Sequence, residues 1–439
     1  MLVVSYAFPP VGGAGVARVL KLTKYLPAHG VSPTVLTVRN PSVPLHDASR
    51  ERDVRGDMEI VRARTLEPGY GAKQAVWSAH RGAGTRTGVG RRLLDAAAAW
   101  ARHALVPDPQ ILWQPAAQLA LARRLLGPDP DDVVFISGPP FSQFLLAPLA
   151  RLRPGTAVVL DYRDEWSTYR ESYEMMGRPA AAAGGPLERA LLRSAHAVTT
   201  ATDAFRDHLL AQFSFLDPAR VHAIPNGYDR DDLPAQLPAP PDDRFVLTYA
   251  GTVFRLTSPR GLLAAIRRLH EAEPELARRL EVRFLGRIVD TEADAFDGMA
   301  ELGVKVLGYV EHARVIPELS ASHMVLCLLD DVPGAERIYP AKIFELMLIE
   351  RPVLTLAPPG ALAELVRTHR LGDVLPPRDE AAIADFLARK LRAFADGVAA
   401  PAPAAVGIER YDRKALAGEF AAVFRQAVRA ARGSPGDAL

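Results

Sequence analysis

The 439-residue sequence contains a single cysteine, Cys327, and no run of about 18 apolar residues. One cysteine cannot form an internal disulfide or a cysteine-based zinc site, which fits a reducing compartment. The missing apolar run argues against a transmembrane helix. The short apolar start, Met1–Tyr6, lacks the basic leader of an export signal. We therefore expect a cytoplasmic protein.

The sequence also lacks an excess of charge of either sign. Lysine and arginine number 53, and aspartate and glutamate number 51, so the formal net charge is +2. This balance argues against a protein that wraps nucleic acid. Apolar residues make up 49% of the chain, which is typical of an ordinary globular protein, and the length suggests two to three domains.

Short apolar runs rich in β-branched residues alternate with helical patterns. The runs show no internal alternation, as expected for strands buried on both faces. They are Leu2–Tyr6, Thr34–Thr37, Val133–Ser137, Ala157–Asp161, Ala197–Thr200, Val221–Ile224, Phe245–Ala250, Glu281–Leu285, Lys305–Leu307, Met324–Leu328 and Pro352–Leu356. Helical windows between them include Gly15–Leu26, Pro186–Ser194, Ala201–Gln212 and Gly261–Glu271. The alternation predicts an α/β protein with parallel sheets.

A proline-rich stretch at 233–243 divides the chain, since it can hold neither helix nor central strand. We expect an N-terminal domain over 1–225 and a C-terminal domain over 226–439. We expect a final helix over about 410–432, and one arrangement has it cross back to the first domain.

A basic segment at about 62–106 interrupts the alternation. Its part from Gly90 to Leu105 reads as an amphipathic helix, with Trp100 on the apolar side and Arg102 on the polar side. We interpret it as a solvated insertion. The alternative is an element that contacts the acceptor or a membrane surface, which would place the protein at the inner face of a membrane.

The first strand runs into a glycine-rich turn that contains Gly12 and Gly13, with a helix after it. Such a turn lets the backbone approach an anion, although a plain strand-to-helix turn explains it equally well. The spacing does not fit a dinucleotide fingerprint, because Arg18 stands where the third glycine is required. A nicotinamide-dependent dehydrogenase is therefore disfavoured.

Basic residues follow the first strand of the second half. Arg255 and Arg260 precede a helix, where arginines can neutralise a diphosphate without metal. Further on, Lys342 and Glu345 share one face of a helix that we expect to begin at Pro340. A cation there fits a phosphate and a carboxylate fits a ribose diol, whereas a surface ion pair is the alternative.

The strand that ends at Asp161 continues as Tyr-Arg-Asp-Glu-Trp. Strand carboxyl ends are where ligands bind in open α/β sheets, so we expect Asp161, Arg163, Asp164 and Trp166 to line a cleft. Ser137, at the end of the preceding strand, faces the same space in this interpretation. A buried ion-pair cluster is the alternative. Two Asp-x-Asp matches, Asp129–Asp131 and Asp229–Asp231, lie in proline-rich or linker surroundings, so we expect no metal site.

An ordered set of motifs resembles the family 4 glycosyltransferases, in the branch with an Asp-Tyr-Arg-Asp-x-Trp motif. The resemblance covers nearly the whole chain except about 40–105 and the tail. The motifs lie at 9–13, 137–142, 161–166, 224–229, 249–252, 285–287, 308–310 and 339–345. The resemblance implies the GT-B fold, in which two Rossmann-like domains with parallel sheets face a central cleft.

The resemblance also implies roles for particular residues. The Gly12–Gly13 loop would lie against the diphosphate and sugar of the donor, and Arg260 and Lys342 would bind the diphosphate. Glu345 would hold the ribose, and the loop with Tyr309 and Val310 would line the base. Arg255 and Arg287 are the other donor-site candidates, and Gly360 and Glu364 occupy a loop that often follows the helix of the ribose glutamate. The catalytic candidates are Asp161, Arg163 and Asp164, and Ser137 and Trp166 are expected on the acceptor side.

Two positions depart from the family pattern. Many members have a glutamate eight residues before the ribose glutamate, but here Arg337 holds that position and Glu336 stands one residue earlier. Many members also have a histidine after the strand that ends here at Leu160, whereas this chain has Tyr162, Arg163 and Asp164 there instead.

The resemblance implies a retaining, metal-independent enzyme that needs no cofactor. Its substrates would be a nucleotide diphosphosugar and a hydroxyl-bearing polysaccharide, glycolipid or metabolite. The alternatives are a sugar-nucleotide epimerase or phosphorylase on the same fold, or a catalytically degenerate sugar-nucleotide-binding protein.

Overall fold

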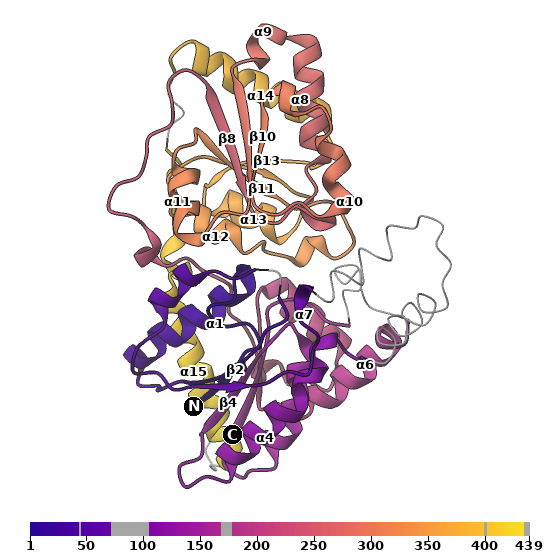
Figure 1. Cartoon of the computed structure of the whole chain (residues 1–439), viewed down its shortest axis with the longest axis vertical. Helices are drawn as coiled ribbons and strands as arrows, with labels where there is room; N and C mark the ends of the chain where they lie inside the picture. The colour runs from indigo at the N-terminus through magenta and orange to yellow at the C-terminus, as the bar shows by residue number, and fades with distance from the viewer. Residues whose placement is uncertain (44, 72–104, 168–177, 399–401, 434–439) are drawn as a thin grey trace. The chain divides into compact units, whose positions relative to one another are not determined.

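The computed structural model describes residues 1–43, 45–71, 105–167, 178–398 and 402–433. The chain forms two compact units, one of Met1–Pro225 with Leu416–Leu439 and the other of Asn226–Ala415. The chain therefore passes from the first unit to the second after Pro225 and returns after Ala415. Helices cover the sheet of each unit (Figure 1).

The first unit contains a seven-stranded sheet within the described residues, in the order β3-β2-β1-β4-β5-β6-β7, and every pairing is parallel. The order reverses between β1 and β4. The strands are β1 (Leu2–Val4), β2 (Thr34–Val38), β3 (Ile60–Ala63), β4 (Val133–Gly138), β5 (Ala157–Tyr162), β6 (Ala197–Thr200) and β7 (Val221–Ala223).

Helices bury apolar side chains against both faces of this sheet. One core joins β1, β2, β4 and β5 to α1 and α15, and the other joins the same strands to α4, α5, α6 and α7. The helices are α1 (Ala14–Tyr25), α4 (Gln114–Leu125), α5 (Ala147–Arg151), α6 (Arg178–Leu192), α7 (Asp203–Gln212) and α15 (Arg413–Arg432). Short 3-10 helices include η2 (Ala48–Asp53), η3 (Pro109–Trp113) and η4 (Phe141–Leu146).

The C-terminal helix α15 belongs to the core of the first unit. Phe420 and Phe424 lie edge-on against Phe135 of β4, with ring centroids 5.6 and 5.3 Å apart. Both helix side chains are buried. The last described helix therefore completes a core whose other members come from the first half of the chain.

The second unit contains a six-stranded parallel sheet within the described residues, in the order β10-β9-β8-β11-β12-β13. Its order reverses between β8 and β11. The strands are β8 (Phe245–Ala250), β9 (Leu280–Leu285), β10 (Val304–Gly308), β11 (Met324–Leu328), β12 (Val353–Leu356) and β13 (Gly372–Leu375).

Helices α8 and α14 pack their apolar sides on this sheet around Leu262, Ile266, Ile383 and Leu387. The helices of the unit are α8 (Arg260–Ala272), α9 (Pro274–Ala277), α10 (Asp290–Ala293), α11 (His312–Ser320), α12 (Lys342–Leu346), α13 (Ala361–Thr368) and α14 (Glu380–Ala395). Two 3-10 helices matter for the site: η6 (Arg230–Asp232) and η10 (Ala335–Arg337).

The structure differs from the sequence-based expectation at several elements. Strands β3 and β13 have no counterpart among the expected runs, and Arg62 lies within β3 rather than at the start of an insertion. The expected amphipathic helix at 90–105 lies almost entirely outside the described residues, as does most of the basic segment. The helix expected to begin at Pro340 begins at Lys342.

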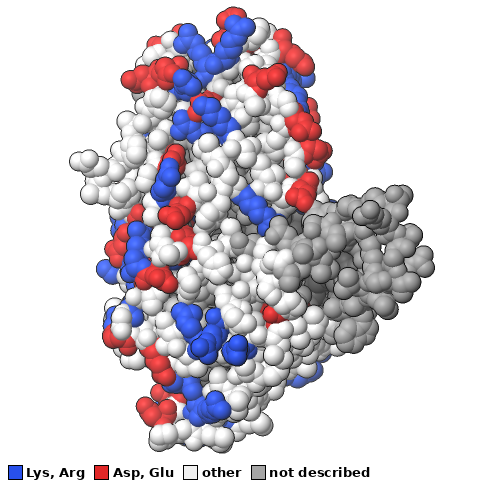
Figure 2. All heavy atoms as spheres, viewed as in Figure 1, with Lys and Arg blue, Asp and Glu red and all other residues white. Residues whose placement is uncertain are grey.

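Basic and acidic side chains are interspersed on the face drawn in Figure 2. This mixture agrees with the net charge of +2. Within the described residues, no helix is both long enough and apolar enough to cross a bilayer.

Shortening Phe424 tests whether α15 belongs to the first core. Phe424→Ala is expected to lower the free energy of unfolding by about 3–5 kcal/mol, because it removes a buried ring and leaves a cavity beside Phe135. Denaturant unfolding followed by circular dichroism measures the change. Arg429→Ala, exposed on the same helix, is the control, with an expected change of about 0.5 kcal/mol or less. Equal effects of the two variants would contradict the packing.

Candidate functional sites in the two units

A buried ion pair lies at the carboxyl end of β5 in the first unit. The Arg18 guanidinium of α1 donates to the Asp161 carboxylate, from Nε to Oδ2 at 3.0 Å and from Nη2 to Oδ1 at 2.8 Å. The hydroxyls of Ser137 and Thr199 donate to the same carboxylate at 2.6 and 2.7 Å. Arg18 also donates to the carbonyls of Ile224 and Pro225.

The surroundings of Asp161 explain its charge state. Burial by itself raises the pKa of Asp161, but the charge of Arg18 and the donated hydrogen bonds outweigh burial and hold the pKa below its ordinary value. The carboxylate is therefore ionised at neutral pH. Each of its oxygens accepts from Arg18 and from one hydroxyl.

The expectation that Ser137, Asp161 and Trp166 line a cleft needs correction for this unit. Their exposed fractions are 0%, 0% and 1%. Ser137 donates to Asp161 within the buried ion-pair cluster. The Trp166 ring stacks on the Phe141 ring, with the ring centroids 5.0 Å apart. The structure therefore contains the buried ion-pair cluster that was the alternative interpretation of this motif.

Arg163 and Asp164 lie closer to the surface. Arg163 is half-buried, and its guanidinium donates to the carbonyls of Gly15, Gly138 and Pro139. It therefore ties the beginning of α1 to the end of β4. Asp164 is exposed, which leaves it as the carboxylate of this motif that a substrate can reach.

The glycine turn before α1 has a specific backbone requirement. Gly13 has a φ of 97°, a conformation that residues with a side chain rarely adopt. The Gly12 N–H donates to the Leu45 carbonyl at 3.0 Å, and Arg62 donates to the Pro9 carbonyl. Hydrogen bonds with neighbouring segments therefore hold the turn in place, and the positive φ of Gly13 determines its backbone conformation.

Three glycine turns meet at the carboxyl ends of β8, β9 and β10 in the second unit. The Gly251 N–H donates to the Leu285 carbonyl, and the Gly286 N–H donates to the Gly308 carbonyl at 2.6 Å. A Cβ at Gly286 would lie 2.1 Å from the Gly251 oxygen, so only glycine fits there. This packing places the turns that carry Arg255, Arg287 and Tyr309 at one edge of the sheet, and all three side chains are exposed.

Lys342 and Glu345 form a cluster with His312. Lys342 Nζ lies 2.9 Å from Glu345 Oε2, and His312 Nε2 lies 3.4 Å from Glu345 Oε1. Burial raises the pKa of Glu345, but the charge of Lys342, together with His312, outweighs it and holds the pKa well below the ordinary value. Since His312 closely follows Tyr309 and Val310, the turn expected at the base adjoins the glutamate expected at the ribose.

Arg260 has acidic partners of its own in the second unit. Its guanidinium pairs with Glu292 at 3.3 Å and with Asp294 at 2.5 Å. It also lines a cavity of about 450 Å³ with Gly261, Asp330 and Arg378, the last two of which are paired at 2.9 Å. Arg260 and Lys342 thus have different acidic partners, and the expected diphosphate role of Arg260 remains a prediction.

Glu336 lies against the loop before α13. The backbone of Gly360 has a φ of 150°, and a Cβ there would lie 2.5 Å from the backbone carbonyl oxygen of Glu336. The Glu336 carboxylate accepts the Gly334 N–H at 2.9 Å and the guanidinium of Arg337. Glu336 is therefore beside the expected Gly360 loop, and Glu364, in the first turn of α13, is exposed.

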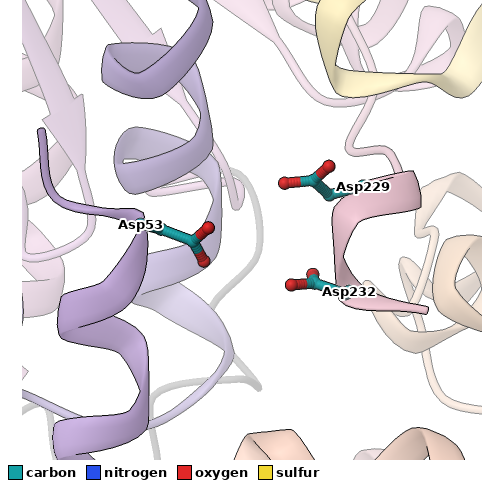
Figure 3. A group of neighbouring side chains, drawn as sticks. All are labelled: Asp53, Asp229 and Asp232. Atoms are coloured by element: carbon teal, nitrogen blue, oxygen red, sulfur yellow. The ribbon is translucent and has the colours of Figure 1, made fainter. Parts of the chain in front are cut away.

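Carboxylates that match a metal pattern in the sequence have local partners. Asp131 accepts from Arg124 at 2.8 Å, and Asp229 accepts the Asp231 N–H at 3.0 Å to cap η6. Figure 3 draws Asp53, from the first unit, and Asp229 and Asp232, from the second. Within its own unit, Asp53 pairs with Lys21 and Lys24.

Two residues of these clusters were not expected from the sequence. Arg18 was noted there only because it departs from a dinucleotide fingerprint, and its partner Asp161 lies 143 residues away along the chain. His312 is 33 residues from Glu345. No spacing rule connects such distant residues, although an arginine inside an otherwise apolar stretch of α1 is a signal that a buried partner exists.

Solved structures define the class of fold. The chain aligns with HepE from Anabaena, solved with UDP and glucose, at a TM-score of 0.59 and 15% identity over 97% of this chain and 98% of that one. It also aligns with the Escherichia coli trehalose-6-phosphate structure bound with UDP-2-fluoro glucose, at a TM-score of 0.59 and 13% identity over the same shares. With the two parallel sheets, these likenesses confirm the GT-B fold.

Sequence comparisons then give the family. Residues 12–227 match the model of the glycosyl transferase 4-like domain, and residues 244–392 match the model of the glycosyl transferases group 1. The chain therefore belongs to the family 4 glycosyltransferases, as the motifs indicated.

Two curated relatives have similar sequences. One is D-inositol 3-phosphate glycosyltransferase 1 of Catenulispora acidiphila, with 30% identity over 58% of this chain and 63% of the relative. The other is a D-inositol 3-phosphate glycosyltransferase of a Nocardioides species, with 28% identity over 49% of this chain and 50% of the relative. In each case the chain matches less than two thirds of the relative's length.

Replacing Asp161 tests its structural role. Asp161→Ala is expected to lower the free energy of unfolding by about 3–5 kcal/mol, because it leaves Arg18 buried without a counter-charge. Denaturant unfolding measures this loss. Asp164→Asn, in the exposed part of the same motif, is the matched control, with an expected change of about 0.5 kcal/mol or less.

The same pair predicts a pH dependence. Since the pKa of Asp161 is lower in the folded protein, its stabilising contribution is present above the unfolded pKa of about 3.9 and is lost as pH falls through the folded value. Asp161→Ala would remove this contribution to acid sensitivity. If the wild type and Asp161→Ala had the same unfolding midpoint at neutral pH, the stabilising role of the Arg18–Asp161 pair would be contradicted.

Proposed function

We propose that the protein is a retaining glycosyltransferase that moves a sugar from a nucleotide diphosphosugar to a hydroxyl group. The observation that carries this proposal is the Lys342–Glu345–His312 cluster beside the Gly308–Val310 turn. Family membership and the titles of the structural neighbours, which name UDP with glucose and a UDP-fluoroglucose, support the choice of substrate class.

The donor would bind to the second unit through charge and hydrogen bonding. Glu345 is ionised at neutral pH, and a carboxylate can accept both hydrogens of a vicinal ribose diol. The Lys342 ammonium has three N–H donors, of which its contact with Glu345 uses one, so it can also donate to a phosphate. Tyr309 is exposed on the adjoining turn and would contact the base.

In the proposed reaction, the bond from the anomeric carbon to the leaving phosphate breaks and a bond from that carbon to the acceptor oxygen forms on the same face. The acceptor proton passes to the leaving phosphate. Negative charge therefore grows on the diphosphate, where pre-positioned cations lower the barrier most. We propose Lys342 for this role, with Arg260 as a second candidate.

On the acceptor side, the corrected site has fewer candidates. Asp164 is exposed at the carboxyl end of β5, whereas Asp161 is buried. We therefore assign the steering of an acceptor hydroxyl to Asp164 and treat Asp161 and Arg163 as positioning residues. D-Inositol 3-phosphate is the first acceptor to test, because the two curated relatives are named for it.

Variants of the cluster test donor binding. Lys342→Ala and Glu345→Ala are expected to abolish turnover and to remove the rise in melting temperature that the donor causes, since a ligand of the folded state raises that temperature. The measurement is a thermal-shift screen with UDP-, GDP-, ADP- and TDP-sugars. Arg314→Ala is the matched control, because Arg314 is exposed on α11, where it pairs with Glu318 of the same helix. Normal donor shifts in both cluster variants would contradict the site.

Metal removal tests the proposed charge stabilisation. If Lys342 and the arginines neutralise the diphosphate, turnover should remain within about 2-fold after treatment with EDTA, since no divalent ion then takes part in charge neutralisation. Initial rates with and without added magnesium give the comparison. A loss of activity that magnesium restores would show that a metal supplies this charge.

A further inference from the structure

Glu188 of α6 is a further buried carboxyl group, and it contacts the residue that follows the Asp-Tyr-Arg-Asp-x-Trp motif. Its exposed fraction is 0%. Its Oε2 accepts the backbone N–H of Ser167 at 3.2 Å and also the Ser167 hydroxyl. Asp161 is paired with an arginine and Asp53 with two lysines, whereas Glu188 accepts its hydrogen bonds from an uncharged serine within the described residues.

The side chains on both sides of this contact are also buried. Tyr162 and Trp166 are 0% and 1% exposed, and both pack on Phe141 and Phe144. Among the described residues, Tyr162 Oη, Trp166 Nε1 and Glu188 Oε1 are buried without a hydrogen-bond partner. A buried polar group in this state is costly, because it has given up its hydrogen bonds to water.

The contact joins α6 to the end of the motif. The Trp166 Nε1 atom lies 3.8 Å from the position of a Cβ on Gly184, which is one helical turn before Glu188. The same face of α6 therefore meets both Trp166 and Ser167. At the other end of the motif, Arg163 is held by the carbonyls of Gly15, Gly138 and Pro139.

We propose that Glu188 is a positioning residue that fixes the segment 163–167, so that Arg163 and the exposed Asp164 keep their places at the carboxyl end of β5. The catalytic consequence rests on the proposed transferase function. The structural consequence does not, because it concerns contacts within the first unit. Glu188 touches no reacting atom in this proposal and acts through Ser167.

The charge on Glu188 changes in the neutral range. Burial, which the hydrogen bonds from Ser167 only partly offset, raises the pKa of Glu188 to about 7, and the nearby carboxylate of Glu165 adds to the rise. The ionised form accepts stronger hydrogen bonds from the Ser167 N–H and O–H than the neutral acid does. The segment 163–167 is therefore held more tightly above pH 7 than below it.

The stability of the fold changes in the opposite direction. Because the folded pKa of Glu188 is raised, its favourable contribution is complete below the unfolded pKa of about 4.3 and is lost as pH rises through about 7.

The first experiment follows the Trp166 environment by near-ultraviolet circular dichroism between about pH 5.5 and 8.5, with Trp166→Phe to identify its signal. The wild type is expected to show a transition near pH 7, and Glu188→Gln, which keeps the shape but cannot ionise, is expected to show none. Asp53→Asn is the matched control, because it removes another buried carboxylate of the same unit and should keep the transition. The melting temperature of the wild type should fall relative to Glu188→Gln as pH rises.

The second experiment measures turnover of UDP-glucose with D-inositol 3-phosphate. Glu188→Ala is expected to lower kcat/KM for the acceptor by about 10- to 100-fold through misplacement of Asp164, while the melting shift caused by UDP-glucose stays unchanged. Glu188→Gln should recover activity to within about 3-fold and lose the wild-type inflection near pH 7. Absence of turnover in the wild type would count against the transferase function with these substrates, and the spectra would still decide the role of Glu188.

The proposal is overturned if Glu188→Gln keeps the transition near pH 7, or if Glu188→Ala folds and leaves the Trp166 signal unchanged. If Glu188→Ala does not fold, the comparison of Glu188→Gln with the wild type across pH remains decisive, because the glutamine keeps the hydrogen-bonding shape.

Discussion

The first unit depends on the requirement that a charge removed from water must be compensated. Arg18 and Asp161 are 2% and 0% exposed, and each would be strongly destabilising alone. Their contact joins α1 to β5, and the remaining donors of Arg18 reach the carbonyls of Ile224 and Pro225, where the chain leaves the unit. One buried pair therefore fixes the glycine turn, the β5 motif and the exit of the chain relative to one another.

The second unit reaches a comparable result with backbone contacts. Gly251, Gly286 and Gly308 allow three turns to approach more closely than side chains would permit, and this brings exposed Arg255, Arg287 and Tyr309 to one edge of the sheet. The charged residues Lys342 and Glu345 then lie in a partly buried cluster rather than in the core. The position of the β5 motif in the first unit thus depends on a compensated buried charge. The position of the three turns in the second unit depends on close backbone approach.

Much of the fold could be predicted because it depends on local patterns. The buried strands have uninterrupted β-branched runs, and the order of the motifs indicated the family. Strands β3 and β13 were missed because they lie at sheet edges, where the half-exposed Ile-Val-Arg-Ala and the polar Gly-Asp-Val-Leu lack such a run. The burial of Asp161 could not be read from the sequence, since it depends on Arg18, which is distant in the chain. The pairing of His312 with Glu345 depends in the same way on tertiary packing.

The β5 motif shows why a charged motif at a strand end does not by itself identify catalytic groups. Its side chains Asp161, Tyr162, Glu165 and Trp166 are buried. Arg163 donates to backbone carbonyls, which leaves Asp164 exposed. Buried charges and aromatic rings are a rigid support, and a rigid support is what a single exposed carboxylate needs to keep one position. A motif of this kind is therefore better understood as one exposed group with the residues that hold it than as a row of equivalent catalytic candidates. Glu188 then belongs to the same support, although it lies outside the motif in sequence.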